Sequence, residues 1–224
     1  MNAIPLRRDV HYPESDGKPM GETEIHIREI IYLFEALDEH LKEVPDVYVG
    51  ADMLLYYVEG NPRKFVVPDV FVTRGVPRGE RRIYKLWEEG RPPCLIVEVT
   101  SDSSRNEDVF EKKVLYERLG VEEYILFDPL QDYLRPALQG FRLVNGRYQP
   151  IPAGAGGAIL SQTTGALLRI EERGIRAVNA ATGVPILSNE EVRAAHQTMQ
   201  ERMQAAEAEL ARLRAENARL RGQA

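Results

Sequence analysis

Two short apolar runs, each interrupted by a single acid, constrain the fold of this chain more than any other feature of its sequence. Residues 66–70 contain Asp69, and residues 95–99 contain Glu98. Both runs are rich in β-branched residues and are bounded by Gly, Pro or Ser, as is typical of buried strands. A charged carboxylate is costly in such a strand unless a cation meets it. The sequence therefore predicts a buried sheet in which two acids share a positive partner.

The expected order of elements is helix, three strands, helix and strand. Apolar residues recur at helical spacing after Thr23, a suitable N-cap, which predicts a first helix with one buried face. The strand-like segments are residues 47–58, 64–73, 94–100 and 123–127. Between the last two, Ser104 and Glu107 form a capping-box pattern, and Gly120 suits the end of a helix. Because a helix connects them, the third and fourth strands are expected to be parallel.

Lys112 on this second helix is the expected positive partner of the two acids. Asp108, Lys112 and Tyr116 are four residues apart and therefore share one helical face, whereas Lys113 lies on another face. Two carboxylates on neighbouring strands can hold Mg²⁺, a hard cation that prefers oxygen ligands. Such a cation activates water for attack on a phosphate, and a lysine can orient the water or neutralise the transition state. The residues expected to anchor the helix to the sheet are Val109, Phe110, Leu115 and Leu119.

The C-terminal tail carries an unbroken heptad pattern. Its a and d positions are Val192, His196, Met199, Met203, Ala206, Leu210, Leu213, Asn217 and Leu220. In a parallel dimer, three g-to-e′ pairs have opposite signs: Arg202 with Glu207, Glu209 with Arg214, and Glu216 with Arg221. Asn at an a position is the usual device for setting parallel two-stranded register. The tail therefore predicts a homodimer through a coiled coil.

A single solvated helix is the alternative for this tail, since His196 and Ala206 are weak core residues. The preceding region, from about residue 133 to residue 187, is expected to form β-hairpins, because Asn145-Gly146 is a strong hairpin signal and Arg173-Gly174 is a second candidate turn. These patterns predict a domain at residues 1–188 and a coiled-coil helix at residues 189–224.

Composition indicates a cytoplasmic protein without membrane contact. No run approaches the length of a membrane span, and no apolar segment follows the N-terminus as in a signal peptide. The single cysteine, Cys94, fits a reducing cytosol and is expected to be a buried structural thiol. The net charge of −6 argues against a general nucleic-acid coat protein. Residues 74–85 are locally basic, and this loop either contacts a phosphate backbone or is an ordinary solvated loop.

Several of these motifs together resemble the Uma2 family, also called the DUF820 group, over about residues 10–150. The matching segments are residues 12–17 and His26, Pro68-Asp69, residues 96–101, Asp108 with Lys112 and Tyr116, and residues 120–129. The resemblance implies an α/β fold of the restriction-endonuclease-like type, in the PD-(D/E)xK superfamily, with an αβββαβ core. It also implies a DNA endonuclease that uses Mg²⁺ or Mn²⁺, with Asp69 and Glu98 as metal ligands and Lys112 as the third catalytic residue.

One position departs from the superfamily pattern, which has a lysine two residues after the second acid. This chain has Thr100 there, and Lys112 matches a lysine that the family has moved to the following helix. A displaced lysine can deliver its ammonium group to the same point, but it can also mark a degenerate site. The superfamily often adds an acid from the first helix, and Glu22 and Glu24 are both candidates.

The sequence thus supports two functional hypotheses. The first is a metal-dependent phosphodiesterase acting on DNA as a coiled-coil dimer. The second is a catalytically degenerate nuclease-fold protein that serves as a dimeric binding or scaffolding module. A small-molecule metalloenzyme has little support, because the four histidines show no ligand spacing: His11, His26, His40 and His196.

Overall fold

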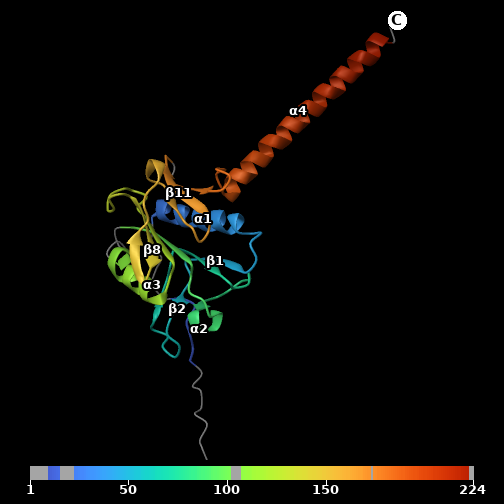
Figure 1. Ribbon diagram of the computed structural model, residues 1–224. Coiled ribbons are helices and arrows are strands. Elements are labelled where there is room, and N and C mark those ends of the chain that lie inside the picture. Colours follow the sequence, from blue (N-terminus) through green and yellow to red (C-terminus); the bar gives the residue numbers. More distant parts are fainter. Residues whose placement is uncertain (1–9, 16–22, 102–106, 173, 222–224) are drawn as a thin grey trace, which may run out of the picture. The chain divides into compact units, whose positions relative to one another are not determined.

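The computed structural model describes residues 10–15, 23–101, 107–172 and 174–221 (Figure 1). The chain divides into two compact units, Met1–Ile186 and Leu187–Ala224. The first unit is built on a mixed sheet whose six strands lie in the order β1-β4-β6-β7-β8-β9. These strands are β1 (Val47–Ala51), β4 (Val70–Arg74), β6 (Leu95–Val99), β7 (Glu123–Phe127), β8 (Leu138–Val144) and β9 (Arg147–Pro150).

Strands β6 and β7 are parallel, as the intervening helix predicted, and the other neighbouring pairs are antiparallel. The core elements follow one another as α1, β1, β4, β6, α3 and β7, which confirms the predicted αβββαβ order. The expected hairpin turn at Asn145-Gly146 joins β8 to β9, and both turn residues have positive φ.

The two faces of this sheet are covered by different layers. Thr23 is the N-cap of helix α1 (Glu24–His40), as the sequence predicted, and its hydroxyl accepts a hydrogen bond from His26 N. Its buried side chains, such as Leu33 and Leu37, pack on one face with the sheet β10-β11-β12. That sheet comprises β10 (Ile159–Leu160), β11 (Ala166–Glu171) and β12 (Gly174–Asn179), after the short 3₁₀ helix η2 (Ala155–Gly157).

The opposite face carries an aromatic cluster, which is covered by the helical segment between β6 and β7. Its members include Tyr84, Tyr116 and Tyr124, all fully buried. A small sheet in the order β3-β2-β5 flanks this cluster. The elements on this side are β2 (Leu55–Tyr56), β3 (Phe65–Val66), β5 (Tyr84–Lys85), α2 (Leu86–Glu89), the π-helix η1 (Glu107–Lys112) and α3 (Lys113–Leu119).

Three local predictions were wrong. The expected strand over residues 47–58 is two strands, because Asp52 has a positive φ of 45° that breaks the extended chain. The strand expected over residues 64–73 is also broken, so Asp69 lies just before β4 rather than within it. Phe110 does not anchor the second helix, since it is 66% exposed. The capping-box residue Ser104 lies outside the described residues.

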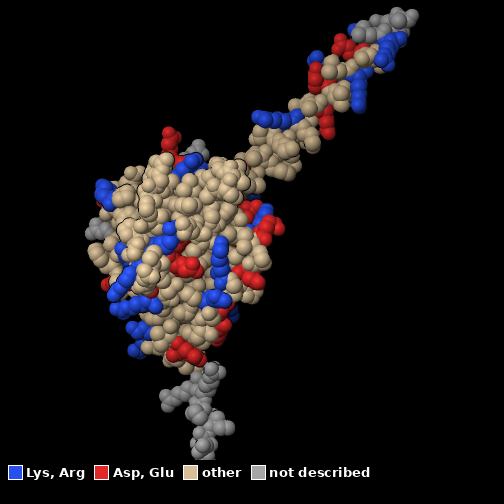
Figure 2. Space-filling view, in the orientation of Figure 1, with Lys and Arg blue, Asp and Glu red and all other residues tan. Residues whose placement is uncertain are grey.

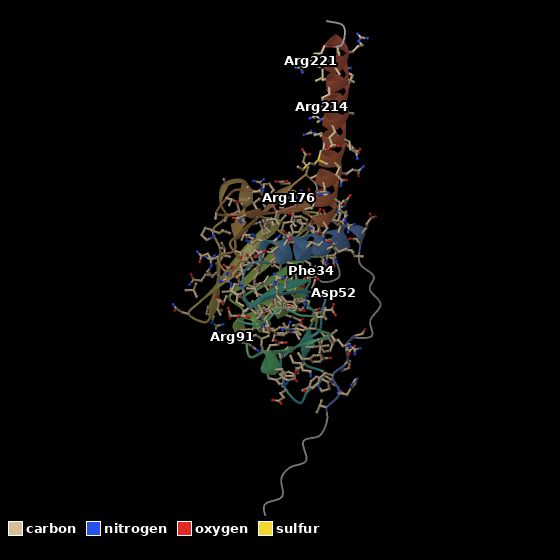
Figure 3. All side chains as sticks on the ribbon, turned by 90° about the vertical axis from the view of Figure 1, so that its right-hand side faces the viewer. Phe34, Asp52, Arg91, Arg176, Arg214 and Arg221 are labelled. Atoms are coloured by element: carbon tan, nitrogen blue, oxygen red, sulfur yellow. The ribbon has the colours of Figure 1, made fainter. Side chains whose placement is uncertain are left out.

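The second unit is dominated by α4 (Asn189–Arg221), a helix of 33 residues. It begins with a capping box: Glu191 N donates to Ser188 Oγ, and Ser188 N donates to the Glu191 carboxylate. The side chains of residues 192–219 are exposed, and Figure 3 shows Arg214 and Arg221 standing away from the helix axis. None of the helices in the described part of the chain combines the length and apolar character that a bilayer span requires.

Candidate active site

Asp69 and Glu98 meet at one end of the main sheet. Strands β4 and β6 pair with Val70 opposite Val97, and this register places Asp69 opposite Glu98. Asp69 N lies 3.4 Å from Glu98 Oε2, and Asp69 Oδ2 accepts a hydrogen bond of 2.6 Å from Val99 N. The break before β4 therefore turns the Asp69 carboxylate onto the end of β6, beside the second acid.

Lys112, the last residue of the π-helix η1, reaches the same point. Its Nζ lies 2.9 Å from Glu98 Oε2 and 2.9 Å from Asp108 Oδ1. The Glu98 and Asp108 side chains are 0% and 1% exposed, and that of Lys112 is 11% exposed. Lys113 points elsewhere, with Nζ 3.4 Å from the centre of the Phe141 ring. The structure thus brings together the three residues that the sequence singled out.

Two buried tyrosines hold these side chains in place by hydrogen bonds. Tyr116 donates a hydrogen bond of 2.8 Å to Glu98 Oε1, so both oxygens of Glu98 have partners. Tyr124 donates to the backbone oxygen of Asp108 over 2.9 Å and holds η1 against the sheet. A π-helix is uncommon and frequently occurs at functional sites. Here it carries Asp108 and ends at Lys112, the two residues that form the buried ion pair.

The cluster has an excess of negative charge. Three carboxylates, Asp69, Glu98 and Asp108, and the single ammonium of Lys112 sum to a formal charge of −2. Burial raises the pKa of Glu98 well above its usual value; Lys112 opposes this shift, and the other two acids add to it. For Lys112, desolvation lowers the pKa, but the three carboxylates outweigh it and raise that pKa. The cluster therefore favours binding another positive charge.

Glu98→Gln should make the protein more heat-stable in EDTA at high pH. A carboxyl whose pKa is raised by folding binds its proton more tightly in the folded state, so stability falls as pH rises toward that pKa. The glutamine variant cannot ionise at this position, so it does not lose stability in this way as pH rises. Lys112 keeps its ion pair with Asp108 in the variant. We expect its melting temperature to exceed that of the wild type most at high pH. The difference should narrow on acidification in melts from about pH 8.5 to about pH 5. A difference that widens on acidification would contradict the assignment.

His26 is the site residue that sequence spacing missed. Its Nε2 lies 3.4 Å from Asp69 Oδ2, and its side chain is 6% exposed. It approaches from α1, on the opposite side of the sheet from Lys112. Metal-ligand spacing could not reveal it, because its partner is 43 residues away along the chain. The sequence feature that could have indicated His26 is its position in the N-terminal region that resembles the Uma2 family.

Of the two first-helix acids expected from the superfamily pattern, the structure describes only Glu24. Glu24 is exposed, and Glu22 lies outside the described residues. The buried acid of α1 is Glu29, whose Oε2 accepts a hydrogen bond of 3.0 Å from Ile175 N in β12. Glu29 therefore stabilises the packing of α1 on the β10-β11-β12 sheet instead of facing Asp69.

The basic loop at residues 74–85 does not border the acids. It follows the end of β4, whereas Asp69 precedes the beginning of that strand. Four of its five basic residues are paired with acids: Arg78 with Asp38, Arg81 with Glu89, Arg82 with Glu14, and Lys85 with Glu88. The visible face of the first unit likewise carries both signs of charge (Figure 2). These contacts favour an ordinary surface loop over a phosphate-binding one.

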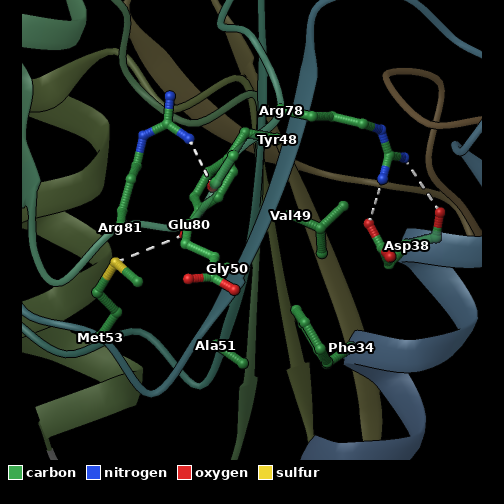
Figure 4. A pocket seen from close by; sticks show the side chains of 11 residues that line it. Phe34, Asp38, Tyr48, Val49, Gly50, Ala51, Met53, Arg78, Glu80 and Arg81 are labelled. Atoms are coloured by element: carbon green, nitrogen blue, oxygen red, sulfur yellow. Dashed lines mark hydrogen bonds and ion pairs between the residues drawn. The ribbon is translucent and has the colours of Figure 1, made fainter.

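The loop instead forms one wall of a pocket of about 500 Å³ (Figure 4). Helix α1 contributes Phe34 and Asp38 to this pocket, and strand β1 contributes another wall. Arg78 Nη1 is bound to Asp38 Oδ1 over 2.7 Å, and the Arg81 guanidinium lies 4.1 Å from the centre of the Tyr48 ring. Both arginines of the pocket already have acidic partners, since Arg78 binds Asp38 and Arg81 binds Glu89.

The acid cluster has the donor chemistry for a hard divalent cation. Asp69 and Glu98 supply carboxylate oxygens on opposed positions of adjacent strands, where Mg²⁺ needs few protein ligands because it keeps several waters. Within the described residues, no group of three or more His, Cys, Asp or Glu side chains is arranged to hold a metal ion. A pair of carboxylates is a ligand set that suits a cation such as Mg²⁺, which keeps several waters.

The comparison with protein families confirms the predicted family. The model of the Uma2 family, described as "Putative restriction endonuclease", matches residues 2–171. A solved structure from Anabaena variabilis, described as a putative nuclease belonging to DUF820, is 14% identical. The match covers 66% of this chain and 76% of that chain, with a TM-score of 0.49. Among curated proteins, none matches the chain.

Proposed function

Because the chain belongs to the Uma2 family of restriction-endonuclease-type proteins, we propose that it hydrolyses phosphodiester bonds in DNA with the help of Mg²⁺ or Mn²⁺. One observation carries this proposal: Asp69, Glu98 and Lys112 converge at one buried end of the sheet. Each residue comes from a different element, so their meeting does not follow from local structure.

Asp69 and Glu98 are the residues that would hold the cation. The charge of the cluster supports this role, since a divalent ion would offset the formal charge of −2 that the side chains leave. When bound, such an ion supplies an activated water and stabilises negative charge on a phosphate. Val99 N and His26 Nε2 fix the Asp69 carboxylate, and Tyr116 fixes that of Glu98.

Lys112 acts on the substrate side of this arrangement. The surrounding acids raise its pKa and keep it protonated, while Asp108 holds its ammonium group when Glu98 engages a cation. A fixed positive charge beside a phosphate stabilises the charge that develops in the transition state. Asp108 is a positioning residue in this scheme, because it acts on the reaction through Lys112.

A cleavage assay tests the proposal directly. Purified full-length protein is incubated with plasmid and linear DNA in Mg²⁺, in Mn²⁺ and in EDTA. We expect cleavage with either metal and none in EDTA. Thr100 occupies the position of the superfamily lysine, which is the observation that favours the degenerate alternative. Binding of DNA or assembly into dimers without cleavage in either metal would support that alternative, a dimeric binding or scaffolding module.

The second unit supports a homodimer through α4. Large apolar side chains at the predicted a and d positions are exposed: Val192 by 47%, Met199 by 70%, Met203 by 56%, Leu210 by 48% and Leu213 by 50%. A lone helix gains little from exposing such side chains, and most helical stability in proteins comes from packing an apolar face. A second copy fits this seam, because the three g-to-e′ pairs of a parallel dimer are opposite in sign.

Removal of α4 should convert the dimer into a monomer. Analytical ultracentrifugation of the full chain at tens of micromolar should show a dimer, and a chain ending at Ser188 should sediment as a monomer. Reversing Glu209 and Glu216 to lysine should weaken the dimer by like-charge contact with Arg214 and Arg221, and high salt should partly mask this loss. A dimer that persists after the truncation would refute α4 as the dimerising element.

A further inference from the structure

Thr100 is a buried threonine that directly follows β6. The residue is 2% exposed, and its Oγ1 forms no hydrogen bond within the part of the chain that the structure describes. A buried polar group without a partner is destabilising, and native proteins usually satisfy such groups with protein or ordered water. The hydroxyl therefore leaves a hydrogen-bonding position that the described residues do not fill.

Strand alternation places Thr100 on the same side of β6 as Glu98. Leu95, Val97 and Val99 belong to the core under α1, whereas Ile96 belongs to the aromatic cluster under α3. Glu98 contacts Lys112 and Tyr116 on that second side. Thr100 N continues the pairing with β7 by donating to Phe127 O over 2.7 Å. Because side chains two residues apart in an extended chain share a face, the Thr100 side chain lies on the same face as that of Glu98.

We propose that the Thr100 hydroxyl binds a water molecule that is shared with the divalent cation held by Asp69 and Glu98. The inference rests on the proposed function and adds a positioning residue to it. A hydroxyl can both donate and accept a hydrogen bond, so it can orient a water without adding charge. Lys112 supplies the positive charge of the site, and Thr100 supplies the orientation of the water.

Three variants separate this role from a structural one. Thr100→Val removes the hydroxyl and keeps the shape, and Thr100→Ser keeps the hydroxyl. Thr73→Val is the control, because Thr73 is also a fully buried threonine of the main sheet, and its hydroxyl interacts with Tyr84. Thr73 lies toward the far end of β4 from Asp69, so its replacement should leave the cation site intact.

Metal binding gives a readout that does not depend on cleavage. Mn²⁺ affinity is measured by calorimetry, and the number of waters on bound Tb³⁺ is measured from luminescence lifetimes in H₂O and D₂O. We expect Thr100→Val to bind Mn²⁺ about tenfold more weakly, as is typical when an outer contact of a metal site is lost. Its bound Tb³⁺ should also carry fewer waters. Thr100→Ser and Thr73→Val should match the wild type in both measurements.

Stability without metal gives the second readout. In EDTA, Thr100→Val should melt about 2–4 °C higher, because it removes a buried group that lacks a partner. A lower melting temperature would show that the hydroxyl has a structural partner and would overturn the proposal. An unchanged affinity and water count in Thr100→Val would also overturn it. If the wild type binds neither Mn²⁺ nor Tb³⁺, the proposed cation site itself fails, and this outcome is distinct from the other two.

Discussion

Replacement of Asp69 by Asn, or of Glu98 by Gln, should reduce metal-dependent DNA cleavage by roughly 10³-fold or more while the domain stays folded. Each change removes one carboxylate from the pair that meets at the end of the sheet. The amide oxygens keep the shape and can still accept hydrogen bonds, such as the one from Val99 N to Asp69. The loss therefore reports on charge and metal binding and not on packing.

Single-turnover cleavage rates and Mn²⁺ affinity measure this effect together. Glu117→Gln is a suitable control, because Glu117 lies on α3 and pairs with Arg147, away from the acid cluster. It should cleave like the wild type. If Asp69→Asn and Glu98→Gln both cleave DNA at the wild-type rate, in preparations free of other nucleases, the reaction takes place elsewhere.

Lys112→Met should lower kcat by about 10²–10³-fold with a smaller change in KM, because a charge aimed at the transition state is lost. Lys113→Met is the matched control, since the neighbouring lysine contacts Phe141 and faces away from the acids. It should retain nearly full activity. The opposite pattern, with Lys113→Met inactive and Lys112→Met active, would mean that the catalytic lysine is misassigned.

The Lys112 variant needs a second version, because removal of one partner from a buried ion pair costs about 3–5 kcal/mol of stability. Lys112 faces both Glu98 and Asp108, so its loss leaves two buried acids without a cation. Adding Asp108→Asn removes one of those charges and should restore thermal stability. The double variant should remain slow, and if it regains wild-type turnover, the charge on Lys112 is not needed for the reaction.

The sequence predicted the core of the fold because its signals there are local or periodic. The Thr23 cap, the turn at Asn145-Gly146 and the parallel β6–β7 pair each follow from a short pattern, and each is present in the structure. The convergence of the acids was also predictable, since a carboxylate in an apolar run requires a partner. Lys112 followed from its four-residue spacing to Asp108 and Tyr116.

The features that sequence did not reveal depend on distant contacts. Asp52 breaks a strand through its own backbone conformation, which a run of β-favouring residues conceals. The π-helix η1 is held by contacts with residues of other elements, such as the hydrogen bond from Tyr124 to the Asp108 backbone. His26 meets Asp69 from another layer of the fold, so no spacing between ligands could have identified it.

Residues from both faces of the sheet meet at this site, and this has a consequence during synthesis of the chain. His26 comes from α1, Asp69 and Glu98 come from the sheet, and Lys112 comes from the layer on the other side. Contacts between residues far apart in sequence form only after the intervening chain has closed. A chain still emerging from the ribosome therefore lacks the complete cluster until η1 docks. Under the proposed function, the chain would therefore not cleave DNA while it is incomplete or partly unfolded.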